Sequence, residues 1–241
     1  MRVQKPRLTV GLAAATLVLA ACTSSSDAGD AASGRDTPDP TPTGTTGSGA
    51  ELVPETGNVE LPAGRHALRI TPSLTYEVDL SGPRFVSDGI YLHHPDVGGI
   101  FVVAAAPADT TTLPRHPCSD LSGTTVGPTP EDLATALAEQ PVIRVRDTGP
   151  VTLDGAEGVS LTVRTPRGYD AADCARPGEL VLFSTGDEDW TWLPEYDGRW
   201  WILDVDGQRV VILNHCDRAC SRDEIAQLRA MTESVTFTSG S

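Results

Sequence analysis

Two Asp-Gly dipeptides near the C-terminal end of the chain each separate two apolar segments. The dipeptides are Asp197-Gly198 and Asp206-Gly207, and the segments are residues 190–196, 199–205 and 208–214. Asp-Gly favours a type I′ turn, because both central residues of that turn have positive φ and its twist suits a two-stranded antiparallel hairpin. The sequence therefore predicts three consecutive antiparallel strands, a meander, in this region.

Short segments of strand character also precede the meander. They are residues 66–70, 75–80, 89–93, 100–106, 142–146, 151–153, 159–164 and 180–185. The segment 100–106 reads IFVVAAA and is apolar at every position, which is typical of a central strand with both faces buried.

Two helices are predicted from their end signals. Thr129 is an N-cap that is followed by Pro-Glu-Asp, and Pro141 ends this first helix. The second helix begins after Ser221, which forms a capping box with Glu224, and leads into a last strand at residues 234–238. This order of elements predicts an α+β fold with a single domain, in which an antiparallel sheet with a C-terminal three-strand meander is covered by two helices.

The N-terminus has the layout of a secretory signal peptide. A basic stretch, MRVQKPR, precedes 13 apolar residues, a length too short for a membrane span. The exit, Leu19-Ala20-Ala21-Cys22, resembles the lipobox of bacterial lipoproteins. The resemblance implies that residues 1–21 are removed and that Cys22 becomes an N-terminus with two or three acyl chains, which anchor stably. The alternative is an ordinary signal peptide with a chance cysteine.

The lipobox predicts a location at the outer face of the cytoplasmic membrane and a division of the chain into three parts. Residues 22–50 consist largely of Ser, Thr, Gly, Ala, Asp and Pro, without a large apolar side chain. Such a segment buries too little surface to fold, so it is interpreted as a flexible tether. Residues 51–241 are expected to form the folded domain.

Several segments carry a family resemblance. VTLDGAEGVSLTVRT (151–165), the meander and EIAQLRAMTESVTF (224–237) resemble the Mog1/PsbP-like fold of actinobacterial lipoproteins, in which a helix and a Ser-aliphatic-x-Phe strand close the domain. More broadly, the chain resembles uncharacterised actinobacterial lipoproteins, with a PAGRHALRI-like opening strand at residues 62–70. The resemblance implies a fold and a location, and it brings no general activity.

The charge of the chain excludes some classes of partner. The net charge is −15, and removal of the signal peptide with its three basic residues makes it −18. This charge argues against binding to nucleic acid and gives no attraction to anionic lipid, so membrane contact is expected through the N-terminal lipid alone. Lys5 is the only lysine, so the processed chain has no lysine-based chemistry.

The cysteines beyond Cys22 are even in number, which favours disulfides in an exported domain. They are Cys118, Cys174, Cys216 and Cys220. Three pairings are open. Cys216–Cys220 with Cys118–Cys174 is favoured, because the last two cysteines of the chain enclose only three residues.

Several segments contain residue types that bind metal ions. His116 and His215 lie beside cysteines and suggest zinc, residues 93–96 read HHPD, and the acidic residues 186–189 and 204–207 suggest calcium. None has the spacing of a known metal motif. The chain is therefore predicted to hold no metal, and these residues are interpreted as strand ends and turns.

No catalytic residue and no cofactor is predicted. The chain has no Gly-x-Ser-x-Gly or Ser-x-x-Lys motif and no phosphate-binding glycine loop. Four aromatic residues are the candidates for ligand binding: Trp190, Trp192, Tyr196 and Trp200. The alternative is that these rings form part of the core.

We therefore expect a lipid-anchored extracytoplasmic protein that is a non-catalytic binding or accessory domain of the cell envelope. Its partner would be an envelope glycan, peptide or protein. The alternatives are a secreted hydrolase with an unrecognised site and a structural partner of a membrane complex. A cleft with perturbed titratable groups would favour the hydrolase, and a flat apolar patch would favour the structural partner.

Overall fold

The regular elements of the computed structural model lie between Asn58 and Ser239. All described residues belong to one unit, Gly47–Ser241. The signal peptide predicted for residues 1–21 and the tether predicted for residues 22–50, with Cys22, lie outside the described residues. The described residues are 53, 58–80, 85–88, 91–93, 99–186, 188–194, 196–216 and 220–240.

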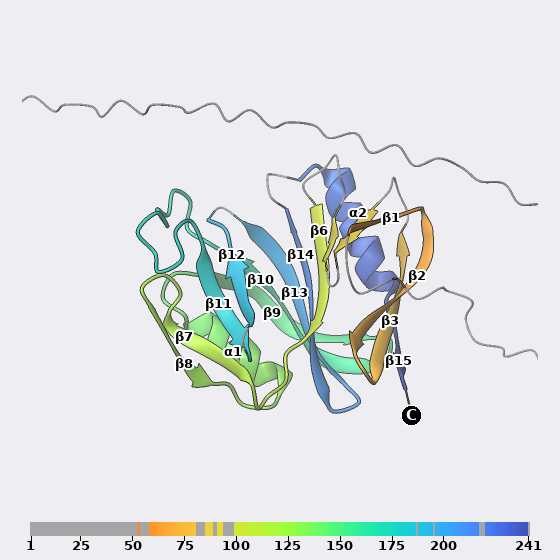
Figure 1. The fold of residues 1–241 in the computed structure, drawn as a ribbon, viewed down its shortest axis with the longest axis horizontal. Helices are drawn as coiled ribbons and strands as arrows, with labels where there is room; N and C mark the ends of the chain where they lie inside the picture. Colours follow the sequence, from red (N-terminus) through yellow and green to blue (C-terminus); the bar gives the residue numbers. More distant parts are fainter. Residues whose placement is uncertain are drawn as a thin grey trace, which may run out of the picture. The chain divides into compact units, whose positions relative to one another are not determined.

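The largest sheet among the described residues has eight strands, and every neighbouring pair is antiparallel (Figure 1). We call it the central sheet. In spatial order its strands are β1 (Asn58–Leu61), β4 (Phe85–Asp88), β5 (Tyr91–His93), β6 (Gly99–Ala105), β14 (Gln208–Cys216), β13 (Asp197–Val205), β10 (Ala156–Arg164) and β9 (Arg144–Leu153). Strand β6 lies inside the sheet and its side chains are mostly buried on both faces, as the IFVVAAA segment predicted.

Two Asp-Gly turns connect neighbouring strands of the central sheet. Asp206 and Gly207 have φ values of 51° and 78° and join β13 to β14, so this predicted turn is confirmed. Asp154 and Gly155 have φ values of 48° and 80° and join β9 to β10 in the same way. Positive φ at both central residues is the requirement of a type I′ turn, which Asp-Gly meets at little cost.

The predicted three-strand meander is wrong in its first strand. Strand β12 (Glu188–Trp192) pairs with β11 (Leu180–Thr185) in a different sheet, so only β13 and β14 remain of the meander. Asp197 and Gly198 form no hairpin turn, because they are the first two residues of β13 and pair with β14.

Gly198 is required for a reason other than a turn. A Cβ at this position would lie 2.5 Å from Cη2 of Trp192 and 3.0 Å from the carbonyl oxygen of Asn214. The indole of Trp192 therefore packs over the backbone of β13 where only glycine leaves room.

Two smaller antiparallel sheets complete the strands that the structure describes. The four-stranded sheet has the order β12, β11, β7 (Thr111–His116) and β8 (Asp120–Thr125). The three-stranded sheet has the order β15 (Thr236–Ser239), β3 (Leu74–Leu80) and β2 (Gly64–Thr71). Strands β7 and β8 were not predicted, because their sequences, TTLPRH and DLSGTT, lack apolar alternation.

Both predicted helices are present with the predicted caps. Helix α1 (Pro130–Glu139) has Thr129 as N-cap, and helix α2 (Arg222–Ser234) has Ser221, each in a capping box. Neither α1 nor α2, the helices of the described residues, is long and apolar enough to cross a membrane.

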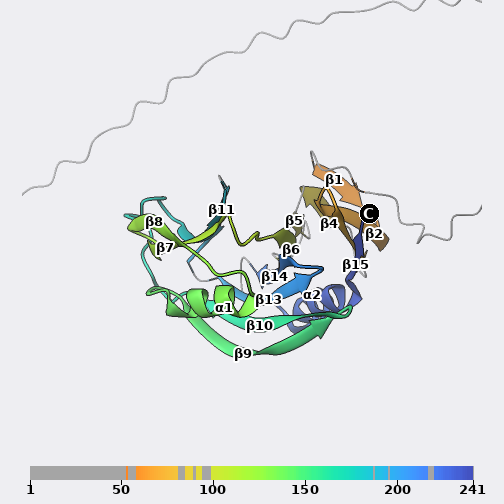
Figure 2. The same ribbon diagram turned by 90° about the horizontal axis from the view of Figure 1, so that it is seen from below.

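The central sheet separates two apolar cores. Figure 2 shows α1 and the four-stranded sheet on one side of β13 and β14, and α2 and the three-stranded sheet on the other. Along β6 the side chains alternate between the cores. Val102 and Ala104 pack in the α1-side core with Leu133 and Leu137 of α1. The next residues along the strand pack in the α2-side core, which includes Phe101, Val103, Leu228 and Met231. The described residues thus form a single α+β domain, with more sheets than the sequence predicted.

Candidate functional site

A groove with a volume of about 470 Å³ opens between the β7–β8 strand pair and helix α1. This volume lies in the usual range of ligand sites, roughly 300–1,000 Å³. The groove is therefore a candidate binding site. Its lining residues are Leu113, Pro114, Arg115, Thr124, Thr125, Val126, Gly127, Glu131, Asp132, Thr135, Ala136, Glu139, Gln140 and Pro141.

Helix α1 forms one wall of the groove. Glu131, Thr135 and Glu139 are four residues apart, so they lie on one helix face, and all three are exposed. Leu133 and Leu137 are buried in the core and hold the helix against the sheet. Neither glutamate side chain has a hydrogen bond or ion pair within the described part of the chain. This wall therefore offers two carboxylates and a hydroxyl to a ligand.

Asp132, a third acidic residue of the groove, belongs to the helix cap. Its Oδ2 accepts a hydrogen bond from the backbone N–H of Thr129 at 2.9 Å, and its own N–H donates to Thr129 Oγ1 at 3.1 Å. Hydrogen bonds from Thr129 lower the pKa of the Asp132 carboxyl, and the charge of Arg209 lowers it further. Asp132 therefore adds negative charge at neutral pH while it fixes the start of α1.

Arg209 of β14 connects this cap to the central sheet. Its side chain is buried; Nε donates to the Ala106 carbonyl at 2.9 Å, and Nη1 donates to the carbonyls of Gly127 and Thr129. Burial lowers the pKa of the guanidinium, which the charge of Asp132 opposes. Because Arg209 bonds to the segment that precedes α1, it fixes the position of the helix wall relative to the sheet.

Gln140 lies at the end of α1 and lines the groove. It is only 6% exposed, and its Nε2 donates to the Leu182 carbonyl of β11 at 2.8 Å. Its Oε1 is buried and accepts no hydrogen bond from a described residue. A buried acceptor without a partner is costly, so a donor from a ligand or from water would stabilise this side chain.

The opposite wall of the groove includes β8, which is an edge strand. It is the last strand of the four-stranded sheet, and all six of its residues are exposed. Within the described ranges, no strand pairs with its outer edge, so a row of backbone N–H and C=O groups remains there. Thr124 and Thr125 belong both to this edge and to the groove lining.

Sequence reasoning identified the cap of α1 but not the groove. A row of Glu131, Thr135 and Glu139 opposite Leu133 and Leu137 is visible in the sequence, and it marks a solvent-facing stripe. What the stripe faces depends on β7 and β8, for which the sequence has no apolar signal.

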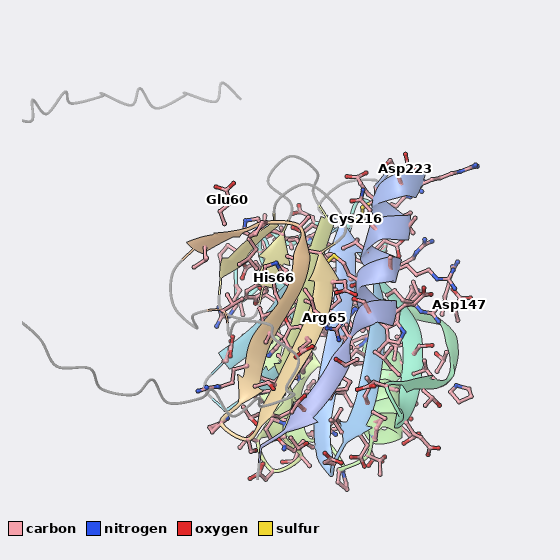
Figure 3. The ribbon with its side chains drawn as sticks, turned by 90° about the vertical axis from the view of Figure 1, so that its right-hand side faces the viewer. Glu60, Arg65, His66, Asp147, Cys216 and Asp223 are labelled. Carbon is pink, nitrogen blue, oxygen red and sulfur yellow. A yellow bond between two sulfur atoms is a disulfide. The ribbon has the colours of Figure 1, made fainter. Side chains whose placement is uncertain are left out.

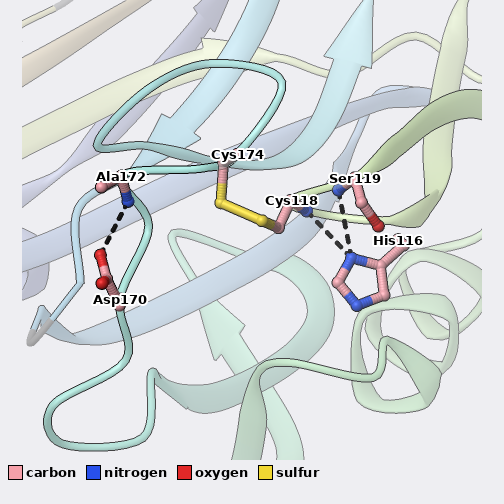
Figure 4. The surroundings of a disulfide bond; sticks show 6 residues. All are labelled: His116, Cys118, Ser119, Asp170, Ala172 and Cys174. Carbon is pink, nitrogen blue, oxygen red and sulfur yellow. Dashed lines mark hydrogen bonds between the residues drawn. A yellow bond between two sulfur atoms is a disulfide. The ribbon is translucent and has the colours of Figure 1, made fainter. Parts of the chain in front are cut away.

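A disulfide lies at the turn between β7 and β8 (Figure 4). Cys118 is bonded to Cys174, with Cα atoms 4.5 Å apart, as predicted. The backbone N–H of Ala175 donates to the Cys118 carbonyl at 2.7 Å. His116 Nδ1 accepts hydrogen bonds from the N–H groups of Cys118 and Ser119, each at 3.2 Å. His116 thus holds the backbone of the turn between β7 and β8. This agrees with its interpretation as a turn residue.

The second predicted disulfide is also present. Cys216 and Cys220 are bonded, with Cα atoms 5.9 Å apart. All four cysteines beyond Cys22 are therefore disulfide sulfurs rather than thiolate ligands. Among the residues the structure describes, no group of three or more His, Cys, Asp and Glu has the spacing of a metal site.

The acidic segments considered for calcium have structural roles where they are described. Asp189 accepts a hydrogen bond from Ser184 at 2.6 Å and pairs with Arg176, and both contacts lower its pKa. Asp204 accepts a hydrogen bond from the N–H of Gly207 at 2.7 Å, which closes the β13–β14 turn. Residues 94–96 of the HHPD segment and residue 187 lie outside the described residues.

The tryptophans predicted as candidates for ligand binding are part of the α1-side core. Trp190, Trp192 and Trp200 are 7%, 2% and 1% exposed, which confirms the core alternative and corrects the binding role. The reason is that β12 pairs with β11, so the side chains of Trp190 and Trp192 point inward. Tyr196, the fourth candidate, is half-buried and stacks on His215 with ring centroids 4.7 Å apart.

The exposed large hydrophobic side chains of the described residues come from separate elements. They are Tyr91 of β5, Leu121 of β8, Leu193 after β12 and Ile225 of α2. Single exposed apolar residues are normal on protein surfaces. They give no specific support to a structural partner that docks through an apolar face.

No family model matches the chain, and no curated protein matches it. The resemblance to Mog1/PsbP-like lipoproteins therefore stays a prediction, and functional inference rests on the groove and on the sequence.

Proposed function

We propose that this chain is a lipid-anchored extracytoplasmic protein, a non-catalytic binding or accessory domain of the cell envelope, and that the groove beside α1 holds its ligand. The lipobox-like exit at Cys22 and the tether composition of residues 22–50 support the anchoring. The observation that carries the binding function is the row Glu131, Thr135 and Glu139 along one wall of the groove.

The groove chemistry suits an extended peptide segment that carries basic side chains. Two carboxylates on one wall, with Asp132 nearby, outnumber the single Arg115 and attract a cation. The free edge of β8 can pair with the backbone of an extended chain, as in β-strand addition. No aromatic side chain is among the described residues that line the groove, so stacking on a sugar ring has no support there.

The composition of the groove argues for binding rather than hydrolysis. No serine, cysteine or histidine is among its described lining residues, so a Ser-His or Cys-His pair is missing from this set. Glu131 and Glu139 are eight residues apart, which places them about 12 Å apart along the helix axis.

Binding can be tested with two defined peptides. The full chain, purified in neutral detergent, is titrated calorimetrically with a capped hexapeptide of alternating valine and lysine, and with a matched peptide of valine and glutamate. We expect the lysine peptide to bind more tightly. Glu131→Gln and Glu139→Gln should each weaken it about fivefold, the effect of one exposed charge pair of roughly 1 kcal/mol.

Glu157→Gln is the control variant, because Glu157 is an exposed glutamate of β10 that does not line the groove. It should bind the lysine peptide like the unmodified chain. Methylation of alternate backbone nitrogens of the peptide should also weaken binding, since it removes pairing with β8. Equal binding of both peptides, or equal effects of the three variants, would refute the proposed site.

A further inference from the structure

Four arginines lie on one face of three neighbouring strands of the central sheet. We call them the arginine face: Arg144, Arg146, Arg164 and Arg199. Arg144 of β9 is directly opposite Arg164 of β10. Arg146 is opposite Thr162, and Thr162 is opposite Arg199 of β13 on its other side. Strand register therefore places Arg146 and Arg199 on either side of one threonine.

The residues between these arginines show which way they point. Val145, Val163 and Trp200 pack in the α1-side core. Because side chains alternate along a strand, the arginines point to the other face of the sheet. That face also carries Asn214, which is opposite Arg199. The Nδ2 of Asn214 donates to the Leu228 carbonyl of α2 at 3.0 Å. The arginine face therefore begins beside α2.

Figure 3 shows the same region from the side of α2. Asp147, which follows Arg146 in β9, lies on the opposite side of α2 from β2 and β3. The contacts of α2 agree with this arrangement, because the helix packs on β3, β6 and β14. The arginines lie beyond α2, on the surface of β13, β10 and β9. Arg199 is half-buried, and the other three are exposed.

The arginines are only partly neutralised. Arg164 forms an ion pair with Asp197. Arg199 donates from Nη2 to Ser160 Oγ at 2.8 Å and from Nη1 to Thr162 Oγ1 at 3.5 Å, both neutral hydroxyls. Within the described part of the chain, no carboxylate oxygen lies within 4.0 Å of a side-chain nitrogen of Arg144, Arg146 or Arg199.

Among the described residues of β9, β10 and β13, two carboxylates lie on this face. Asp197 is held by Arg164, and Asp147 accepts a hydrogen bond from Thr162 Oγ1 at 3.4 Å. Four guanidinium groups against two carboxylates leave an excess of positive charge in a chain whose net charge is −15. Arg144 and Arg164 are like charges directly opposite each other on neighbouring strands, an arrangement that destabilises a sheet.

We propose that the arginine face binds the phosphate group of a soluble ligand, held between Arg146 and Arg199 above Thr162. Two strand spacings separate these arginines by about 10 Å at the backbone, a distance that two long side chains can close around one anion. A guanidinium binds two oxygens of an oxyanion side by side. A phosphate has enough oxygens for both guanidinium groups, whereas one guanidinium occupies both oxygens of a carboxylate.

A soluble ligand fits this face better than a membrane surface does. The net charge of −15 repels an anionic bilayer as a whole, while a single phosphate group experiences mainly the local arginines. The site is independent of the groove, since it lies on the α2 side of the central sheet.

The test is calorimetric titration of the full chain with inorganic tripolyphosphate at low ionic strength. We expect binding that weakens with salt, and a loss of about tenfold in each of Arg146→Gln and Arg199→Gln, the typical effect of removing hydrogen bonds to a charged group. Arg199→Lys should also lose affinity, because an ammonium keeps the charge but not the fork. The exposed side chain of Arg146 has no hydrogen bond or ion pair in the described part of the chain, so its variant should keep the fold.

Arg69→Gln is the matched control, because Arg69 is an exposed arginine of β2 in the three-stranded sheet. It should bind tripolyphosphate like the unmodified chain, and so should Glu131→Gln of the groove. Absence of binding, an equal loss with Arg69→Gln, or equally tight binding of polyglutamate would overturn the proposal. Binding to vesicles of anionic lipid but not to tripolyphosphate would assign the face to the membrane and would also overturn it.

Discussion

Gly198 shows how one residue can carry two different structural signals. Next to Asp197 it matches the sequence of a hairpin turn, yet its position in β13 is extended and paired. The glycine is there because the ring of Trp192 occupies the space of a side chain. Trp192 in turn contacts Trp200 and His215, with ring centroids 5.7 Å and 5.2 Å away. A single missing Cβ thus permits the aromatic packing of the α1-side core.

We predict that Gly198→Ala lowers the free energy of unfolding by about 1–3 kcal/mol, the usual cost of overpacking a core. The measurement is denaturant unfolding of the oxidised full chain, followed by tryptophan fluorescence. Gly149→Ala is the control, because a Cβ at Gly149 of β9 would meet no atom within 4 Å. If both variants unfold at the same denaturant concentration as the unmodified chain, the packing explanation is wrong.

At the scale of elements, the β7–β8 pair depends on connections outside its own sequence. Its residues are mostly Thr, Ser, Gly and polar groups, and β8 buries none of them. The pair is held by its contact with β11 and by the Cys118–Cys174 disulfide at its turn. One wall of the groove therefore rests on the disulfide and on the burial of Leu113 of β7, since β8 itself buries no residue.

We predict that replacing Cys118 and Cys174 together by alanine lowers the free energy of unfolding by about 4 kcal/mol, since the bond closes a long loop. The separation of the two cysteines is 56 residues, against 4 for Cys216 and Cys220. The same substitution of the second pair is the control and should cost about 2 kcal/mol on the same chain-entropy model. Equal losses in the two double variants, measured by denaturant unfolding, would contradict this account of the β7–β8 wall.

At the scale of the whole molecule, the central sheet places the two candidate surfaces apart. The acidic groove lies on the α1 side, and the arginine face lies on the α2 side. A domain with one acidic and one basic surface can engage two ligands of opposite charge at once, which would suit the accessory function that we propose.

We predict that the anchor is attached at Cys22. In the native membrane fraction, the N-terminal peptide of the mature chain should begin at Cys22 and carry the mass of acyl chains, as measured by mass spectrometry. A Cys22→Ser variant should lack acyl chains and leave the membrane fraction, whereas Ser24→Ala should remain lipidated. An unmodified mature N-terminus at another residue would refute the lipobox interpretation.

The sequence by itself determined the features that depend on neighbours along the chain. The Asp206-Gly207 turn, the caps at Thr129 and Ser221 and the two-sided burial of β6 follow from local backbone and periodicity rules, and the structure shows them. The favoured disulfide pairing is confirmed as well.

Only the tertiary structure decided which strands lie side by side. A period of two tells which residues of a strand share a face, but not which strand is its neighbour. The pairing of β12 with β11 therefore buried Trp190 and Trp192 where the sequence left core and surface open. The same limit hid both proposed sites, because the groove needs β8 beside α1, and the arginine face needs β9, β10 and β13 in register.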